Sequence, residues 1–299
     1  SSQNGGGLTD LLNPSLNILQ RLYGEINILG AVVPQGIVIN GVNTINKQDL
    51  KWMDYDLILV SLKDVTVLRT NAQSEFVSIL KEAAELGLDT DKFVLDRVVC
   101  VPNFTLDKYR KLRHSALSIF SKDCFGGLTY HRFALPFLSP TINMYTSDED
   151  FLKFLKNPIQ NVKSELKFQK TEYEEDLKIH YPVFKIGDSE WHMNHYSDTN
   201  VAFRKWYERS YRVNWFNLLV VMSTEKPEIL AEFDKLPYFK KVCFVPFETD
   251  LDSGFYIDAS RYSEKKFSRL THLMVLGQFI YYDLWDMVLY GKKTVILQK

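Results

Sequence analysis

The chain has 299 residues, of which 45% are hydrophobic and 14% are aromatic. This composition supplies enough apolar material for about two domain cores, and it excludes a chain that is disordered over most of its length. Lysine and arginine together number 36 and aspartate and glutamate 37, which gives a formal net charge of −1. No overall field of either sign would therefore attract nucleic acid or an anionic membrane, and a charged ligand must be bound locally.

The three cysteines, Cys100, Cys124 and Cys243, are odd in number and far apart in the chain. That usage is typical of a cytoplasmic protein in a reducing compartment, because a disulfide framework needs cysteines in pairs. The first residues lack the charged start and apolar core of a signal peptide, and no apolar run reaches about 18 residues. We therefore expect no membrane span.

Residues 8–110 show an alternation of strands and helices that predicts a small Rossmann-like domain with a parallel sheet. A helix is expected from Asn13-Pro14 to a stop at Gly24. The further predicted elements are strands at 26–33, 36–40, 56–62 and 98–101 and a helix at 73–86. The Gly-rich fingerprint of a dinucleotide site is missing, so we read the sheet as structural, and the sequence identifies no cofactor.

A polar and basic segment at 102–115 is the best candidate for a domain boundary, and a second, layered α/β domain is expected over 111–299. Its predicted strands are 116–120, 141–145, 183–186, 218–222 and 242–245. Its predicted helices are 128–135, 148–155, 200–211, 227–233 and 278–289. The acidic stretch 171–178 reads as a solvated loop or helix face.

Three segments of this second domain, 121–140, 181–196 and 202–217, resemble an uncharacterised bacterial family, the domain of unknown function nineteen-nineteen. Phe125 departs from its pattern, in which an indole is usual. The matching positions are Cys124, Gly126, Gly127, Tyr130, Ser139, Pro140, Tyr181, Pro182, Gly187, Asp188, His192, His195, Tyr196, Trp206, Arg209, Arg212, Asn214 and Asn217. Members of that family often accompany exopolysaccharide biosynthesis genes or glycosyltransferase domains. The resemblance therefore implies a role in cell-surface polysaccharide synthesis, and it adds Tyr130 and Asn214 to the candidate substrate-binding residues.

The loop with Cys124, Gly126 and Gly127 follows the first strand of this domain and precedes a predicted helix. Ligands bind at that end of strands in open α/β sheets, and paired glycines at a helix start let a backbone approach an anion closely. The same partial positive charge would lower the pKa of a cysteine. The competing interpretation is that Cys124 is a small buried side chain beneath a tight turn. We expect it at the mouth of the pocket and not as the nucleophile.

His192 and His195 lie three apart in a segment that looks extended, so they should face opposite sides of a sheet. At most one of them then points into a given pocket, and a shared metal ion is not expected. One of the two could act as a base beside Asp188, the alternative being a hydrogen-bonded structural histidine.

Arg209 and Arg212 flank the buried stripe of the helix predicted at 200–211. Two guanidinium heads at the edge of a core could hold a phosphate or carboxylate, and a solvated face with surface ion pairs is the competing interpretation. We expect these arginines to line one anion-accepting pocket with Gly126 and Gly127.

Two functions remain open at this point. One is a transferase acting on a nucleotide sugar or polysaccharide precursor, in which Arg209 and Arg212 hold the anion and Asp188 or a histidine handles protons. The other is a non-catalytic module that binds a sugar or phosphate through aromatic side chains. The aromatic candidates for that module are Tyr130, Tyr181, Trp191 and Tyr196.

Overall fold

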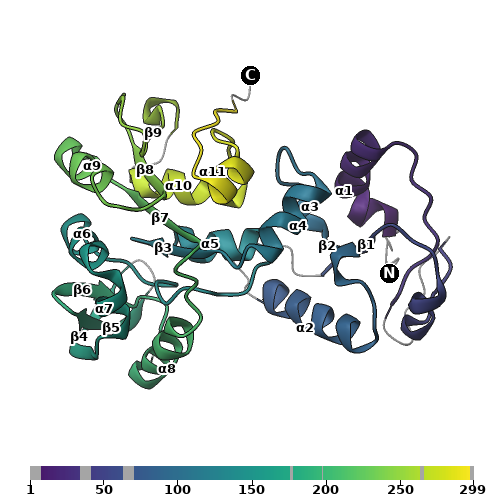
Figure 1. Ribbon diagram of the computed structural model, residues 1–299, viewed down its shortest axis with the longest axis horizontal. Coiled ribbons are helices and arrows are strands. Elements are labelled where there is room, and N and C mark those ends of the chain that lie inside the picture. Colours follow the sequence, from purple (N-terminus) through teal and green to yellow (C-terminus); the bar gives the residue numbers. More distant parts are fainter. Residues whose placement is uncertain are drawn as a thin grey trace. The chain divides into compact units, whose positions relative to one another are not determined.

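The computed structural model describes residues 8–33, 42–62, 71–175, 178–196, 198–262 and 266–296. The chain forms two compact units (Figure 1). Unit 1 comprises residues 1–110 together with 133–136, and unit 2 comprises residues 111–132 together with 137–299.

Unit 1 is a mixed α/β unit whose described strands form a two-stranded parallel sheet, with Ile58 opposite Phe93 and Val60 opposite Leu95. As predicted, one helix ends at Gly24 and another just before Gly87, and both glycines have a positive φ. The elements of this unit are α1 (Leu8–Tyr23), η1 (Lys47–Trp52), β1 (Ile58–Val60), α2 (Asn71–Glu85), η2 (Thr90–Lys92), β2 (Phe93–Leu95) and α3 (Asp96–Val99), followed by α4 (Leu106–His114), which runs on into unit 2.

Two strand predictions in unit 1 are wrong. Residues 26–33 form no strand and pair only through an isolated bridge between Ala31 and Thr44. The apolar run at 98–101 falls partly within the helix α3, and the strand of this region, β2, lies just before it. The helix begins at Asp96, whose carboxylate accepts a hydrogen bond from the N–H of Arg97. The strand predicted at 36–40 lies outside the described residues.

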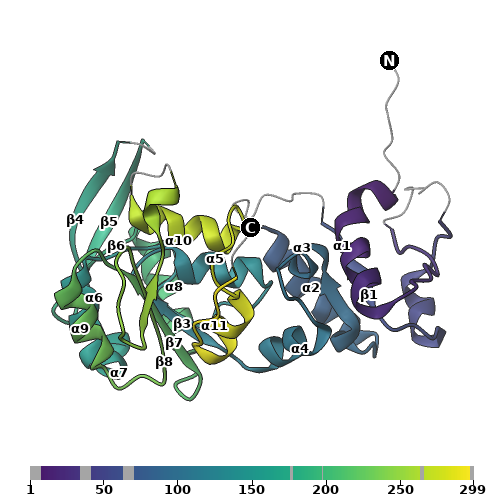
Figure 2. The same ribbon diagram turned by 90° about the horizontal axis from the view of Figure 1, so that it is seen from above.

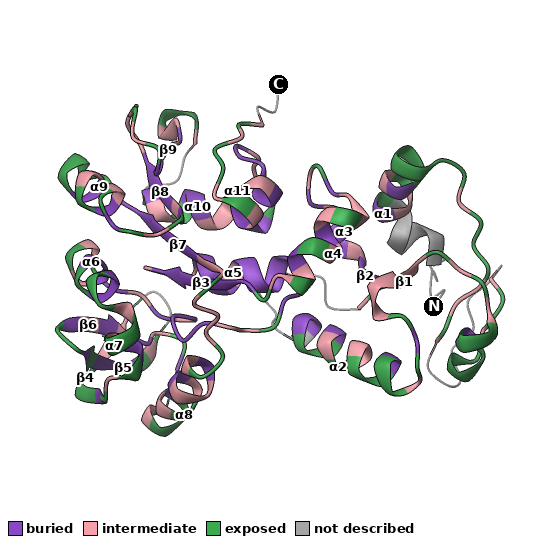
Figure 3. Cartoon of the chain, in the orientation of Figure 1, coloured by how far each residue is buried: buried purple, intermediate pink, exposed green. Residues whose placement is uncertain are grey.

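Unit 2 is built on a four-stranded, fully parallel sheet in the order β3-β7-β8-β9. The strands are β3 (Ser118–Ser121), β7 (Leu218–Ser223), β8 (Lys240–Val245) and β9 (Gly254–Tyr256). Nearly all of their residues are buried, which is the pattern of a parallel sheet covered on both faces (Figure 3). The sequence predicted three of these four strands and missed the short β9.

Helices and a second sheet cover the parallel sheet, and Phe120, Phe154, Trp191, Trp206 and Val220 belong to the core that these layers share. The helices are α5 (Phe125–Arg132), α6 (Asp148–Lys156), α7 (Pro158–Lys163), α8 (Thr199–Ser210), α9 (Pro227–Asp234), α10 (Phe267–Leu276) and α11 (Leu284–Tyr290), with a 3-10 turn η3 (Ala259–Arg261). Helices α5 and α10 pack against each other (Figure 2).

The second sheet of unit 2 is antiparallel, with the order β4-β5-β6. Its strands are β4 (Leu166–Glu174), β5 (Ile179–Ile186) and β6 (Ser189–His192). Within the acidic stretch 171–178, predicted as a solvated loop or helix face, residues 171–174 belong to the edge strand β4. Most of the β4 side chains are exposed, so their charges remain solvated although the backbone is extended.

Three further predictions in unit 2 need correction. Residues 141–145 form no strand, and only Tyr145 pairs, through an isolated bridge with His192. The last helix begins at Leu284 rather than near 278, because the carboxylate of Asp283 caps it by accepting hydrogen bonds from the N–H groups of Trp285 and Asp286. The helix predicted at 128–135 starts and ends three residues earlier, at Phe125–Arg132.

Candidate active site

The loop after β3 carries Lys122, Asp123 and Cys124 in succession, and it lies at the carboxyl edge of the parallel sheet, where α/β proteins bind ligands. Ser121, the last residue of β3, accepts a hydrogen bond from the N–H of Gly126 at 3.0 Å and donates one to the carbonyl of Asp123 at 2.7 Å. The carboxylate of Asp123 accepts from the N–H of Phe125 at 3.0 Å. These bonds start α5 immediately after Cys124.

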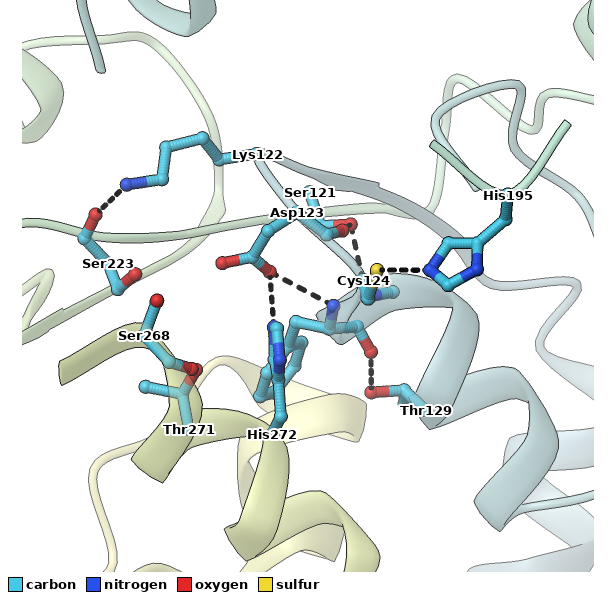
Figure 4. Close-up of polar contacts among 12 residues, drawn as sticks. Ser121, Lys122, Asp123, Cys124, Thr129, His195, Ser223, Ser268, Thr271 and His272 are labelled. Carbon is cyan, nitrogen blue, oxygen red and sulfur yellow. Dashed lines mark hydrogen bonds and ion pairs between the residues drawn. The ribbon is translucent and has the colours of Figure 1, made fainter. Parts of the chain in front are cut away.

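His195 approaches Cys124 from the turn that follows β6 (Figure 4). Its Nε2 atom lies 3.4 Å from the sulfur of Cys124, within hydrogen-bonding range for a thiol. This contact connects the loop after β3 to the turn at the end of the antiparallel sheet β4-β5-β6. A thiol and an imidazole at this separation can exchange a proton.

The surroundings favour the neutral form of both groups. Burial raises the pKa of the Cys124 thiol to about 12, with a further increase from the Asp123 carboxylate and an opposing effect of Arg269. Desolvation of the ring also lowers the pKa of His195, although the residue as a whole is exposed, and His272 lowers it further. At neutral pH the pair is therefore a thiol and a neutral imidazole, and not a thiolate with an imidazolium.

A second pair lies beside the first, in which the Nε2 atom of His272, on α10, is 3.0 Å from the Asp123 carboxylate. Both side chains are largely buried. Burial by itself would raise the pKa of Asp123, but the charges of His272 and Lys122 and the N–H of Phe125 outweigh it and lower that pKa. The aspartate is thus ionised and held close to His272.

Lys122 belongs to a separate network at the same edge of the sheet. Its ammonium lies 2.5 Å from the carboxylate of Asp148 and also donates to the carbonyl of Ser223. Thr224 donates to the other oxygen of Asp148 at 2.6 Å. This network ties the loop after β3 to the start of α6 and the end of β7.

Gly126 and Gly127 allow neighbouring side chains to pack closely against the first turn of α5. A Cβ atom on Gly126 would lie 2.6 Å from the hydroxyl oxygen of Ser121, and one on Gly127 would lie 3.3 Å from side-chain atoms of Ile142 and Asn143. Because Asp123 and Ser121 take the N–H groups of Phe125 and Gly126, the start of α5 offers fewer donors to an anion than the sequence suggested.

Tyr130 and Asn214 act as structural ties. The hydroxyl of Tyr130 accepts from the N–H of Ile119 at 2.9 Å and donates to the carbonyl of Leu117 at 3.1 Å, and the whole side chain is buried. The amide of Asn214 donates to the carbonyl of Ala116 at 3.0 Å. Neither side chain adjoins the sulfur of Cys124.

The two arginines have different surroundings. Arg209 is buried, donates to the hydroxyl of Tyr196 at 2.6 Å and lies over the ring of Phe137, with 5.0 Å between the guanidinium carbon and the ring centroid. Arg212 lies beyond the end of α8 and is exposed. Arg209 thus stabilises the core behind His195, while Arg212 faces solvent.

Asp188 and His192 lie apart from the thiol. Asp188 occupies the turn between β5 and β6 with 93% of its side chain exposed, 3.9 Å from Lys185. His192 lies between two carboxylates, 3.1 Å from Glu172 and 3.3 Å from Glu190. Of the three predicted acid–base residues, only His195 reaches Cys124.

Sequence reasoning missed Asp123, His272 and Arg269 as members of this site. Asp123 directly precedes Cys124, and its place as the residue capping a helix start was a usable signal. His272 and Arg269 are three apart on α10 and so share a face of that helix. Nothing in the sequence connects that face to the loop after β3.

Within the described ranges, no cluster of three or more histidine, cysteine or acidic side chains is arranged to hold a metal ion. Across the same ranges, no helix combines the length and the apolar character that crossing a bilayer requires.

These features define a mixed α/β protein with a thiol–imidazole pair at the carboxyl edge of a parallel sheet. The chain belongs to the family described as Domain of unknown function (DUF1919), which matches residues 96–291. It is also 36% identical over 140 residues to an uncharacterized protein of Haemophilus influenzae. That match covers 45% of this chain and 64% of the relative, so the chain spans somewhat less than two thirds of the relative's length.

Proposed function

We propose that unit 2 is a group-transfer enzyme that acts on an anionic sugar precursor, such as a nucleotide sugar, with His195 as its general base. The observation that carries the proposal is the 3.4 Å contact between His195 and Cys124 at the carboxyl edge of the sheet. A general base must be unprotonated at the working pH, and desolvation of the ring lowers the pKa of His195.

In the proposed step, Nδ1 of His195, the ring nitrogen that does not contact Cys124, takes the proton of an acceptor hydroxyl as the oxygen attacks the donor. A new bond forms between that oxygen and the transferred group, and the bond to the leaving phosphate breaks with its electron pair passing to the phosphate. Cys124 is a positioning residue in this scheme, because its thiol contacts the base and fixes the direction of the ring.

Arg269 supports an anionic substrate. It is exposed, and it is near enough to Cys124 to lower the pKa of the thiol. A guanidinium at that place would stabilise the charge that develops on a departing phosphate. The arginines predicted for this task, Arg209 and Arg212, are respectively engaged with Tyr196 and turned to solvent.

The alternative function, a non-catalytic binding module, would need aromatic side chains on the surface. The aromatic residues proposed for it, Tyr130, Tyr181, Trp191 and Tyr196, are all buried. A shallow sugar-binding surface needs exposed rings, so we place this function second.

The test begins with thermal shift measurements of the whole chain against a panel of sugar nucleotides, followed by an assay for product with any ligand that stabilises it. We expect turnover with at least one ligand and a loss of about a hundredfold or more in kcat for His195→Gln. Asp188→Asn is the control, because the Asp188 side chain is 93% exposed in the turn between β5 and β6 and its ion pair is with Lys185. Stabilisation without turnover would establish the binding module, and unchanged kcat in His195→Gln would exclude His195 as the base.

A further inference from the structure

The amino edge of the parallel sheet in unit 2 carries fully exposed aromatic side chains. Phe216 lies in the loop that leads into β7 and is 103% exposed relative to the reference state, and Phe239 directly precedes β8 and is 99% exposed. Tyr211, at the other end of the loop that holds Phe216, is 90% exposed. Large apolar side chains are seldom left in water to this extent unless another surface covers them.

The two loops are neighbours in space, because they enter adjacent strands. β7 and β8 pair in parallel with Leu219 opposite Lys240. Phe216 therefore lies three residues before Leu219, and Phe239 lies one residue before Lys240, the residue opposite Leu219. Both phenylalanines therefore lie at the same end of the sheet.

The charged residues of the two loops are all basic, and the acidic residue next to them is Asp234 at the end of α9. Segments 211–217 and 235–241 contain Arg212, Lys235, Lys240 and Lys241 and no aspartate or glutamate. Lys240 and Lys241 are engaged locally, with the carboxamide of Asn217 and the carbonyl of Leu236 respectively. Arg212 and Lys235 are exposed beside the aromatic residues. We call Tyr211, Arg212, Phe216, Lys235 and Phe239 the amino-edge patch.

We propose that the amino-edge patch docks unit 2 on the surface of an anionic lipid bilayer. Phenyl rings at loop tips can enter the boundary between headgroups and acyl chains, where Tyr211 can keep its hydroxyl in the polar layer. Arg212 and Lys235 complement the negative headgroups. The near-zero net charge of the chain does not oppose this, because charges within about a Debye length of the surface dominate the attraction.

A bilayer fits these side chains better than a strand of nucleic acid does. Bases stack on the faces of rings that the protein holds in place, whereas Phe216 and Phe239 are exposed on all sides and can insert end first. Docking by this edge leaves the thiol–imidazole pair free, because the six residues of β7 separate the two edges of the sheet by about 20 Å. The inference stands apart from the proposed function, since it uses none of the residues at the carboxyl edge.

The test is flotation of the whole chain with vesicles of phosphatidylcholine alone and with about 30% phosphatidylserine. We expect binding only to the anionic vesicles, weakened by high salt. Phe216→Ser combined with Phe239→Ser should reduce binding about tenfold or more, as should Arg212→Glu combined with Lys235→Glu. Trp52→Ser is the control, because Trp52 is 79% exposed but lies in unit 1. Circular dichroism verifies that each variant is folded.

Three results would overturn the proposal. The first is no flotation of the wild-type chain with anionic vesicles. The second is flotation that the paired phenylalanine variant leaves unchanged. The third is evidence that the same residues hold a single-stranded oligonucleotide or a second copy of the chain instead of a bilayer, measured by fluorescence anisotropy and by sedimentation. None of these outcomes bears on turnover by His195, so the two proposals fail independently.

Discussion

The sulfur of Cys124 and Nε2 of His195 lie 3.4 Å apart although 71 residues separate the two in the chain. The loop after β3 supplies the thiol and the turn after β6 supplies the ring. The sequence analysis expected Cys124 at the mouth of a pocket and not as the nucleophile. Burial, which raises the pKa of the thiol to about 12, is a structural argument for the same expectation.

Cys124 should therefore react slowly with iodoacetamide at pH 8. A thiol of pKa about 12 is ionised about a thousandfold less at that pH than one of pKa 9, and only the thiolate reacts. Mass spectrometry of the alkylated peptides gives the rate, with Cys100, which is half-buried like Cys124, as the internal comparison. Rapid labelling of Cys124 in folded protein would show that it is a thiolate and reopen its role as nucleophile.

His195 should titrate below the usual range for histidine. Desolvation of the ring is the larger cause of its lowered pKa, and His272 adds to it. The variant His272→Gln should therefore raise the pKa of His195 while leaving it below about 6.5, because the desolvation remains. NMR titration of the ring protons measures both values. A pKa that does not move in His272→Gln would show that the two histidines are uncoupled.

Asp123→Asn should destabilise the fold by about 1 to 3 kcal/mol at pH 7, because it leaves His272 beside an uncharged partner. Since the folded-state pKa of Asp123 is lowered, its carboxylate contributes stability above the unfolded pKa of about 4, and that contribution is lost as the pH falls through the folded value. The free energies of unfolding of Asp123→Asn and of the wild-type chain should therefore become more similar in acid.

Urea unfolding at pH 7 and near pH 3.5 measures that difference, with Asp188→Asn as the control. The exposed Asp188 carboxylate should show little change at either pH. An equal difference at both pH values for Asp123→Asn would mean that the charge of Asp123 is not what stabilises the fold.

Gly126→Ala should cost more stability than Gly127→Ala. The new methyl group would lie 2.6 Å from the hydroxyl oxygen of Ser121 in the first case and 3.3 Å from its nearest neighbours in the second. We expect a loss of about 1 to 3 kcal/mol for Gly126→Ala and less for Gly127→Ala. Urea midpoints rank the two variants, and the reverse order would contradict the packing role assigned to Gly126.

Periodicity and composition predicted much of the fold. The buried strands β3, β7 and β8 were predicted because a strand covered on both faces must be apolar throughout, and that signal is local. The half-buried strand β1 was predicted from the same kind of apolar run. The helix end at Gly24 was likewise predicted, because a left-handed residue favours glycine, and the glycines that follow the predicted helices 73–86 and 278–289, Gly87 and Gly291, have the same conformation. Short elements such as α3 and β9 were misread or missed, because a few residues carry little periodicity.

The sequence by itself also determined the candidate loop, since strand, small residues and helix follow one another around Cys124. It could not select among the histidines, because their distance from the thiol depends on how β6 crosses toward β3. Only the tertiary structure placed His195 at the sulfur and His192 between two glutamates, and only it brought α10 with His272 to Asp123. The physical reason is that helix and strand patterns report which face is buried, whereas a site depends on which buried faces meet.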